Sequence, residues 1–96
     1  MPEMRFIVEW PNGREEACYS PSLVVRDYLN ENVEYALSDF LERSRAALLI
    51  ASDRVKAKYG HACSLALNQL QRIEATAEGF ADASDPRVRC KRFVFD

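Results

Sequence analysis

The sequence predicts a single α+β domain spanning residues 1–96, in which an antiparallel pair of helices covers one face of a three-stranded antiparallel sheet. Three observations predict this class. An alternating apolar stretch with an Asn-Gly turn opens the chain, two long stretches with helical spacing follow, and a second alternating stretch ends it. With 48% hydrophobic and 29% charged residues, the composition is typical of a globular protein.

The N-terminal β-hairpin is the clearest local prediction. Apolar residues alternate along Met4–Trp10, as in a half-buried strand, and Arg14–Ser20 is the expected return strand. Asn12 and Gly13 between them are a strong hairpin signal, because both residues tolerate positive φ. With these two residues as the loop, Trp10 faces Glu15, and the hairpin presents one apolar face.

This hairpin register predicts that a strand with basic side chains lies beside the hairpin. It sets Glu9 opposite Glu16, and like charges directly opposed are unfavourable. The segment Val88–Phe95 can supply basic side chains on one face of a strand, namely Arg89 and Lys91. We therefore expect that segment to complete the sheet, with a bulge near Arg92, where its apolar positions change parity.

Residues 20–37 give the weakest structural signals in the chain. Residues 20–22 form a turn, and residues 30–32 form a loop. Val24 and Val25 favour a strand for residues 23–29, whereas the spacing of the leucines permits a helix capped by Ser22. We favour a helix of one or two turns.

Two helices are predicted in the middle of the chain. Ser38 is the expected cap of the first helix, which runs to Tyr59 and ends at Gly60. Ser64 is the expected cap of the second helix, over Leu65–Glu78. The short loop between the helices predicts an antiparallel pair.

The first helix has an almost unbroken apolar centre at residues 46–51. A surface helix usually has one apolar stripe, so this helix should be covered on two sides. Its own sheet provides one cover, and either a neighbouring helix or another protein chain provides the second. The candidate interface residues are Leu49 and Ile50 on the helix and Ile7 on the exposed sheet face. We therefore expect a homo-oligomer, such as a dimer, or a complex with a partner protein.

Charge and targeting signals exclude several classes of protein. The net charge of −2 provides no basic surplus for a nucleic-acid partner. No secretory signal is present, and no apolar stretch approaches the ~20 residues needed to span a membrane. We therefore expect a cytoplasmic protein. The three cysteines lack a Cys-x-x-Cys pair, which favours reduced thiols over a disulfide framework.

A metal or thiol site is the first alternative function. Its candidate ligands are His61 and Cys63 between the helices, with Cys18 and Cys90 on the strands. Standard ligand spacings are absent, so an exposed loop histidine and three small buried cysteines explain the same residues better. Cys63 could also act as a nucleophile with His61 as its base, but no nearby carboxylate orients the pair. We therefore assign no catalytic residue, metal or cofactor, and we disfavour an enzyme.

A small-molecule site is the second alternative, as in a small enzyme or carrier. The residues that could line it are Tyr19, Ser20, Ser22, Arg26 and Tyr59. A turn followed by a helix cap accounts equally well for the residue types at the end of the hairpin.

Several strings along the chain are informative when taken together, including Trp10-Pro11-Asn12-Gly13, Cys18-Tyr19-Ser20-Pro21-Ser22, Ala51-Ser52-Asp53-Arg54-Val55 and Ala57-Lys58-Tyr59-Gly60. With these strings the chain resembles a family of small bacterial nitrogen starvation response proteins of about this length. The resemblance covers nearly the whole chain up to Phe80 and implies a context more than a mechanism. Members are encoded in gene clusters with a nitrilase, which links them to nitrogen scarcity and to nitriles as a nitrogen source. No residue role carries over. The sequence therefore favours an accessory protein that acts by protein association, and the small-molecule alternative would concern a nitrile-derived metabolite.

Overall fold

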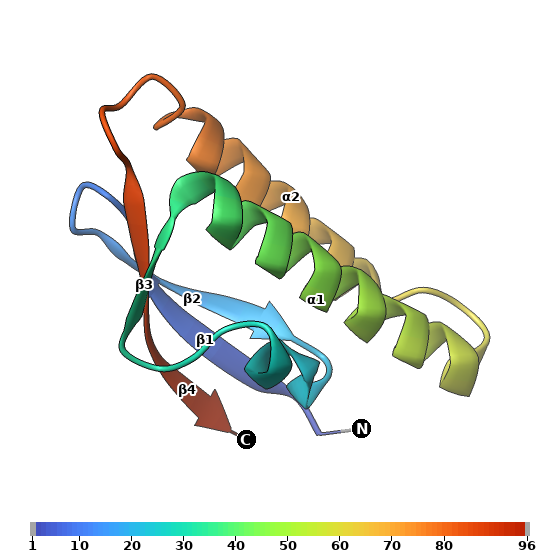
Figure 1. Ribbon diagram of the computed structural model, residues 1–96. Coiled ribbons are helices and arrows are strands. Elements are labelled where there is room, and N and C mark those ends of the chain that lie inside the picture. The colour runs from blue at the N-terminus through green and yellow to red at the C-terminus, as the bar shows by residue number, and fades with distance from the viewer. Residues whose placement is uncertain (1, 96) are drawn as a thin grey trace.

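Two helices lie on one face of an antiparallel sheet in the computed structural model, which describes residues 2–95 (Figure 1). The sheet has four strands where the sequence predicted three. The elements in chain order are β1 Met4–Glu9, β2 Glu15–Ser20, the 3₁₀ helix η1 Leu23–Asp27, β3 Val33–Ala36, α1 Leu37–Tyr59, α2 Ser64–Glu78 and β4 Arg87–Phe95. The strand order is β2-β1-β4-β3, so the first and last strands are neighbours at the centre.

The hairpin forms as predicted, but its predicted register is wrong by one residue. Glu9 pairs with Glu15, because the loop has three residues instead of two. The Trp10 N–H donates to the Arg14 carbonyl at 2.9 Å, and the Gly13 N–H donates back to the Trp10 carbonyl at 2.8 Å. Pro at the second position favours such a turn, and Gly13 then takes the positive φ of 85° that closes a three-residue loop.

Strand β4 contains the predicted bulge. Ile7 pairs with Arg92 while Val8 pairs with Cys90, which leaves Lys91 as the extra residue. The Lys91 Nζ lies 3.9 Å from a Glu9 carboxylate oxygen and 3.6 Å from a Glu15 carboxylate oxygen. The predicted basic neighbour is therefore confirmed, although the opposed glutamates are a different pair from the one expected.

The fourth strand, β3, lies in the segment that the sequence left without an assignment. It pairs with β4 through Glu34 opposite Arg89, and only Tyr35 of its side chains is buried. Asn32 turns the chain into this strand with a φ of 62°. The ambiguous segment before it forms η1, and the Ser22 side chain accepts the Val24 N–H as the predicted cap.

Both predicted caps of the long helices are wrong, although the helices are confirmed. Helix α1 begins one residue before Ser38, and Ala36 caps it without a side-chain hydrogen bond. The Leu37 N–H donates instead to the carbonyl of Pro86 at 3.0 Å, so the residue just before the distant strand β4 satisfies this end of the helix. Ser64 is the first residue of α2, and Cys63 caps it without a side-chain hydrogen bond. Gly60 ends α1 with a φ of 88°, as predicted.

The core lies between the sheet and the helical layer. Phe40 and Leu48 of α1 and Ile73 of α2 are fully buried against the inward side chains of β1. Trp10 meets Phe40 edge-on, with 5.7 Å between the ring centroids. The sheet, η1 and α2 all lie against α1 (Figure 1), so the predicted two-sided cover comes from the chain itself.

Candidate functional site

Two adjoining surface pockets lie where the edge strand β2 meets the helical pair, and we call them together the Tyr19 groove. The smaller pocket, of about 180 Å³, is lined by Glu3, Tyr19, Pro21, Val55, Tyr59 and Cys63. The larger pocket, of about 330 Å³, is lined by Glu3, Arg5, Ala17, Tyr19, Leu65, Gln69 and Arg72. Glu3 and Tyr19 belong to both pockets.

Tyr19 is held in a fixed orientation in this groove. Its hydroxyl donates to the Glu3 Oε2 at 2.9 Å, and the Arg5 guanidinium lies 5.7 Å from its ring centroid. Partial burial, followed by the hydrogen bond to Glu3, raises the pKa of Tyr19 to about 12. The phenol therefore stays protonated at neutral pH, so it can orient a ligand by hydrogen bonding but cannot act as a base.

Gln69 is the buried polar residue of the groove, with only 1% of its surface exposed. Its Oε1 accepts the Tyr19 backbone N–H at 2.9 Å and an Arg72 N–H at 3.1 Å. Because both partners are donors, the amide orientation is fixed with its nitrogen turned away from them. Within the described part of the chain that nitrogen has no hydrogen-bond partner. A buried donor left unpaired costs about 1–3 kcal/mol.

The sequence analysis did not single out Gln69. A signal was present, because Gln69 lies three residues after Ala66 and four before Ile73, within the apolar stripe of α2. A glutamine on such a stripe indicates a buried polar contact.

The structure brings together two of the five predicted ligand residues, Tyr19 and Tyr59, in the smaller pocket. Ser20 and Ser22 are buried in the turn, where the Ser20 hydroxyl donates to the Ser22 carbonyl at 2.7 Å. The Ser22 hydroxyl accepts the Val24 N–H. Arg26 lies elsewhere, with its guanidinium 5.6 Å from the ring centroid of Phe95.

The predicted metal or thiol residues occupy separate places. Cys18 and Cys90 are fully buried on strands that flank β1, Cys63 is half-buried in the Tyr19 groove, and His61 is exposed in the loop before α2. Burial raises the pKa of Cys90 to about 11 and raises that of Cys18 further. Among residues 2–95, no group of three or more His, Cys, Asp or Glu side chains is placed to hold a metal ion.

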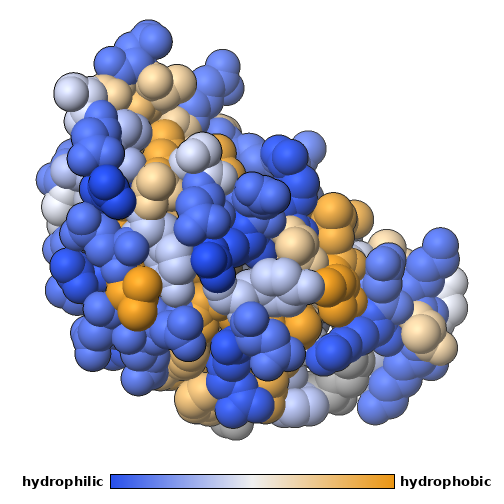
Figure 2. All heavy atoms as spheres, in the orientation of Figure 1, coloured by the Kyte–Doolittle hydropathy of each residue, from blue (hydrophilic) through white to orange (hydrophobic). Residues whose placement is uncertain are grey.

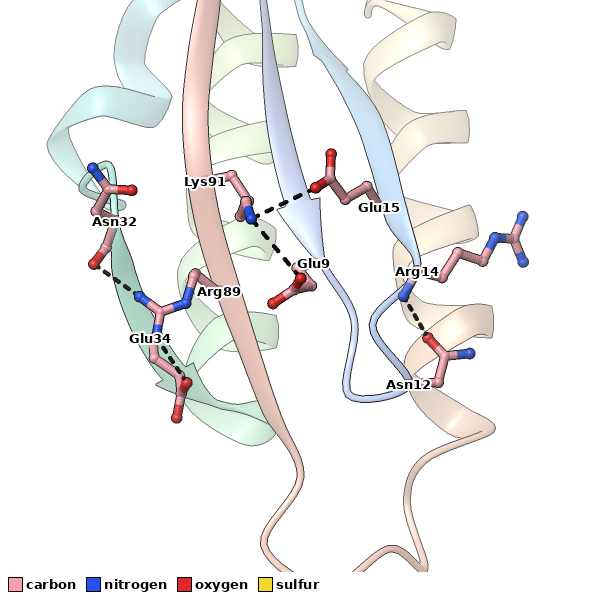
Figure 3. A network of polar contacts seen from close by, with 8 residues as sticks. All are labelled: Glu9, Asn12, Arg14, Glu15, Asn32, Glu34, Arg89 and Lys91. Carbon is pink, nitrogen blue, oxygen red and sulfur yellow. Dashed lines mark hydrogen bonds and ion pairs between the residues drawn. The ribbon is translucent and has the colours of Figure 1, made fainter.

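Paired charges lie on the sheet face turned away from the helices (Figure 3). Arg89 donates to the Glu34 carboxylate at 3.2 Å and to the Asn32 carbonyl at 3.1 Å, and Lys91 lies between Glu9 and Glu15. Ile7, a predicted interface residue of this face, is only 8% exposed. The sheet face therefore offers little apolar surface at this position.

The outer surface of the helical layer is different, because apolar side chains reach it. Leu49 of α1 is 43% exposed and Leu67 of α2 is 38% exposed, whereas Ile50 is half-buried. Two polar contacts join the helices, one on each side of these leucines along the helix axes. They are an Arg45–Glu74 ion pair and a hydrogen bond from the Cys63 N–H to the Ser52 hydroxyl at 3.2 Å. Figure 2 shows hydrophobic atoms over the helical layer among hydrophilic ones. We call the exposed side of α1, together with Leu67, the outer helical surface.

Comparisons with known proteins identify a family but no activity. Residues 5–93 match the family described as nitrogen starvation-induced protein NitG. No curated protein and no solved structure matches the chain significantly. In the described residues, no helix is long and apolar enough to cross a membrane.

Proposed function

Because the chain belongs to the family of nitrogen starvation-induced protein NitG, we propose that it serves the nitrogen-starvation response as an accessory protein that acts by protein association. The observation that carries this proposal is the exposure of Leu49 at the middle of the longest helix. Leucine side chains gain free energy when they leave water. Leu49, together with the exposed Leu67 on the neighbouring helix and the charged residues along α1, has the composition of an association surface with a polar rim.

The test replaces Leu49 by glutamate and measures assembly. Untagged protein is purified from its host under nitrogen limitation and analysed by native mass spectrometry and size exclusion. We expect the wild-type chain to carry a protein partner, and Leu49→Glu to appear as a bare chain of 11.0 kDa with an unchanged circular dichroism spectrum. The matched control is Leu65→Glu, since Leu65 is also exposed but faces the Tyr19 groove. Unchanged assembly of Leu49→Glu would show that this surface is no interface.

We place this role within nitrile utilisation, as the family resemblance implies. A strain lacking the gene should then grow more slowly on a nitrile as sole nitrogen source and normally on ammonium. Equal growth of the mutant and its parent on the nitrile would remove this part of the proposal.

A second candidate function is the binding of a small metabolite, such as a nitrile-derived compound, in the Tyr19 groove. The observation that favours it is the unpaired amide nitrogen of Gln69 in a residue that lines the larger pocket. A ligand present at about 100 times its dissociation constant should raise the unfolding free energy by about 2.7 kcal/mol. Thermal unfolding with pathway metabolites tests this, and the absence of any shift would count against a carrier.

The metal or thiol alternative stays a prediction for Cys18, His61, Cys63 and Cys90. Metal analysis of protein purified without a histidine tag, under reducing conditions, tests it. Substoichiometric metal would remove it.

A further inference from the structure

We propose that the partner on the outer helical surface is a second copy of this chain, with the two α1 helices packed antiparallel about a twofold axis at Leu49. The proposal rests on the association function proposed above and specifies its partner. It follows from how the exposed charges are arranged on either side of Leu49.

Leu49 lies on a stripe of exposed residues that are spaced three or four apart along α1. The stripe consists of Glu42, Arg45, Leu49, Asp53 and Lys56, all of which are exposed. Its charges have opposite signs at equal distances from Leu49. Four positions away on either side are Arg45 and Asp53, and seven positions away are Glu42 and Lys56.

In a twofold interface the same patch meets itself, so it must be self-complementary. When two α1 helices lie antiparallel with Leu49 at the axis, positions equally far from Leu49 face each other. Arg45 then meets Asp53 of the second copy, and Glu42 meets Lys56 of the second copy. A parallel pair in register would instead set each charge against its own kind, which is unfavourable. The charge pattern therefore favours the antiparallel arrangement.

The dimensions and the neighbouring residues fit such a pair. Seven residues correspond to about 10 Å along a helix, so all the facing pairs lie within the 23 residues of α1. Ala46, beside Leu49, is small enough to let two helices approach. Arg45 also pairs with Glu74 of α2, and a guanidinium has enough donors for two carboxylates.

Exposed ion pairs are individually weak, so these charges should set the register and orientation more than the affinity. The apolar contact comes from Leu49 of both copies, with Leu67 of each copy beside it. The interface therefore has a leucine centre and a charged rim whose signs favour the antiparallel alignment over the parallel one.

The experiment exchanges the outer charges and measures the dimer by analytical ultracentrifugation of untagged protein. Each single variant, Glu42→Lys or Lys56→Glu, places two pairs of like charges in one dimer. We expect either change to raise the dissociation constant about tenfold or more. The double variant Glu42→Lys/Lys56→Glu restores both pairs and should dimerise like the wild-type chain.

Mixing the two single variants tests whether positions 42 and 56 lie at the interface. One chain then carries lysine at both positions and the other carries glutamate at both, so only the mixed dimer has opposite charges throughout. We expect the mixture to form heterodimers at concentrations at which each variant alone is mostly monomeric. The control Lys58→Glu makes the same charge change in the last turn of α1 but outside the stripe, and it should leave dimerisation unchanged.

The outcomes separate this proposal from the one on which it rests. If both single variants dimerise as tightly as the wild-type chain while Leu49→Glu does not, the proposed register is refuted and association through Leu49 stands. If the purified wild-type chain is monomeric and Leu49→Glu loses a different protein, the second copy is refuted as the partner. If Leu49→Glu changes neither kind of assembly, both proposals fall.

Discussion

Replacing Gln69 by leucine should leave the stability of the protein nearly unchanged. Leucine has a similar volume and needs no hydrogen bond, and Gln69 is almost completely buried. The change removes the acceptor of the Tyr19 backbone N–H and leaves that part-buried donor unpaired, which costs about 1–3 kcal/mol. It also removes a buried amide nitrogen without a partner, which returns about 1–3 kcal/mol. The Arg72 guanidinium loses a bond as well, but Arg72 is exposed and water can replace it.

These terms nearly cancel, so we expect the free energy of unfolding to change by no more than about 1 kcal/mol. Gln69→Ala should instead destabilise by about 2 kcal/mol, because it leaves a cavity. The assay is urea unfolding followed by circular dichroism, and it compares midpoints at constant m-value. Gln71→Leu on the exposed side of the same helix is the control and should lie within about 0.5 kcal/mol of wild type.

A loss of more than about 2 kcal/mol for Gln69→Leu would contradict the reasoning. It would mean that the amide nitrogen forms a hydrogen bond in solution that offsets its burial. A stabilised Gln69→Leu would mean that the glutamine is kept at a cost in stability, as is common where a polar group serves binding.

Three further predictions concern the sheet and the titratable groups. Lys91→Met should destabilise by about 1 kcal/mol in urea unfolding, because Glu9 and Glu15 then oppose each other without a cation. The loss should shrink at high salt and in the double variant with Glu9→Gln, and a loss independent of salt would point to packing instead. Tyr19 has a folded pKa of about 12 against 10.0 when unpaired, so it supports the fold fully below pH 10 and progressively less as pH rises through 12. Tyr19→Phe should lack this part of the alkaline destabilisation. If the free energy of unfolding depends on pH identically in both proteins, the raised pKa of Tyr19 is refuted. Of the three cysteines only the half-buried Cys63 should react with Ellman's reagent in the native protein, and Cys63→Ser should abolish the reaction. Rapid reaction of a second thiol would show that Cys18 or Cys90 is accessible to solvent.

Elements with strong local signals were predicted correctly from the sequence. The alternation in β1, the turn at Gly13 and the stop of α1 at Gly60 depend on residues that are close together in the chain. The bulge in β4 was also visible, because its apolar positions change parity. The expectation that opposed glutamates need a basic neighbour identified Lys91 even with the wrong hairpin register, because both registers set Glu9 opposite a glutamate.

Features that depend on distant partners were missed. Strand β3 has only four residues with one buried side chain, and its strand conformation comes from pairing with β4, more than fifty residues later. The capping role expected of Ser38 is unnecessary because Pro86 accepts the Leu37 N–H. The Tyr19 groove forms only when α2 brings Gln69 to the edge of β2, and neither segment indicates this alone.

The strand order also determines when the protein can fold during synthesis. Strand β1 pairs with β4, with Met4 opposite Phe95, so the centre of the sheet joins the two most distant parts of the chain. A nascent chain that has reached the end of α2 has its hairpin and its helices but lacks the central strand, and β3 has no neighbour yet. Such a chain exposes the apolar faces of β1 and α1 to other proteins until β4 leaves the ribosome. Folding then waits for the pairing that spans the greatest sequence distance, which is the slow kind of step. We therefore expect newly made chains to need chaperone protection until β4 has been translated.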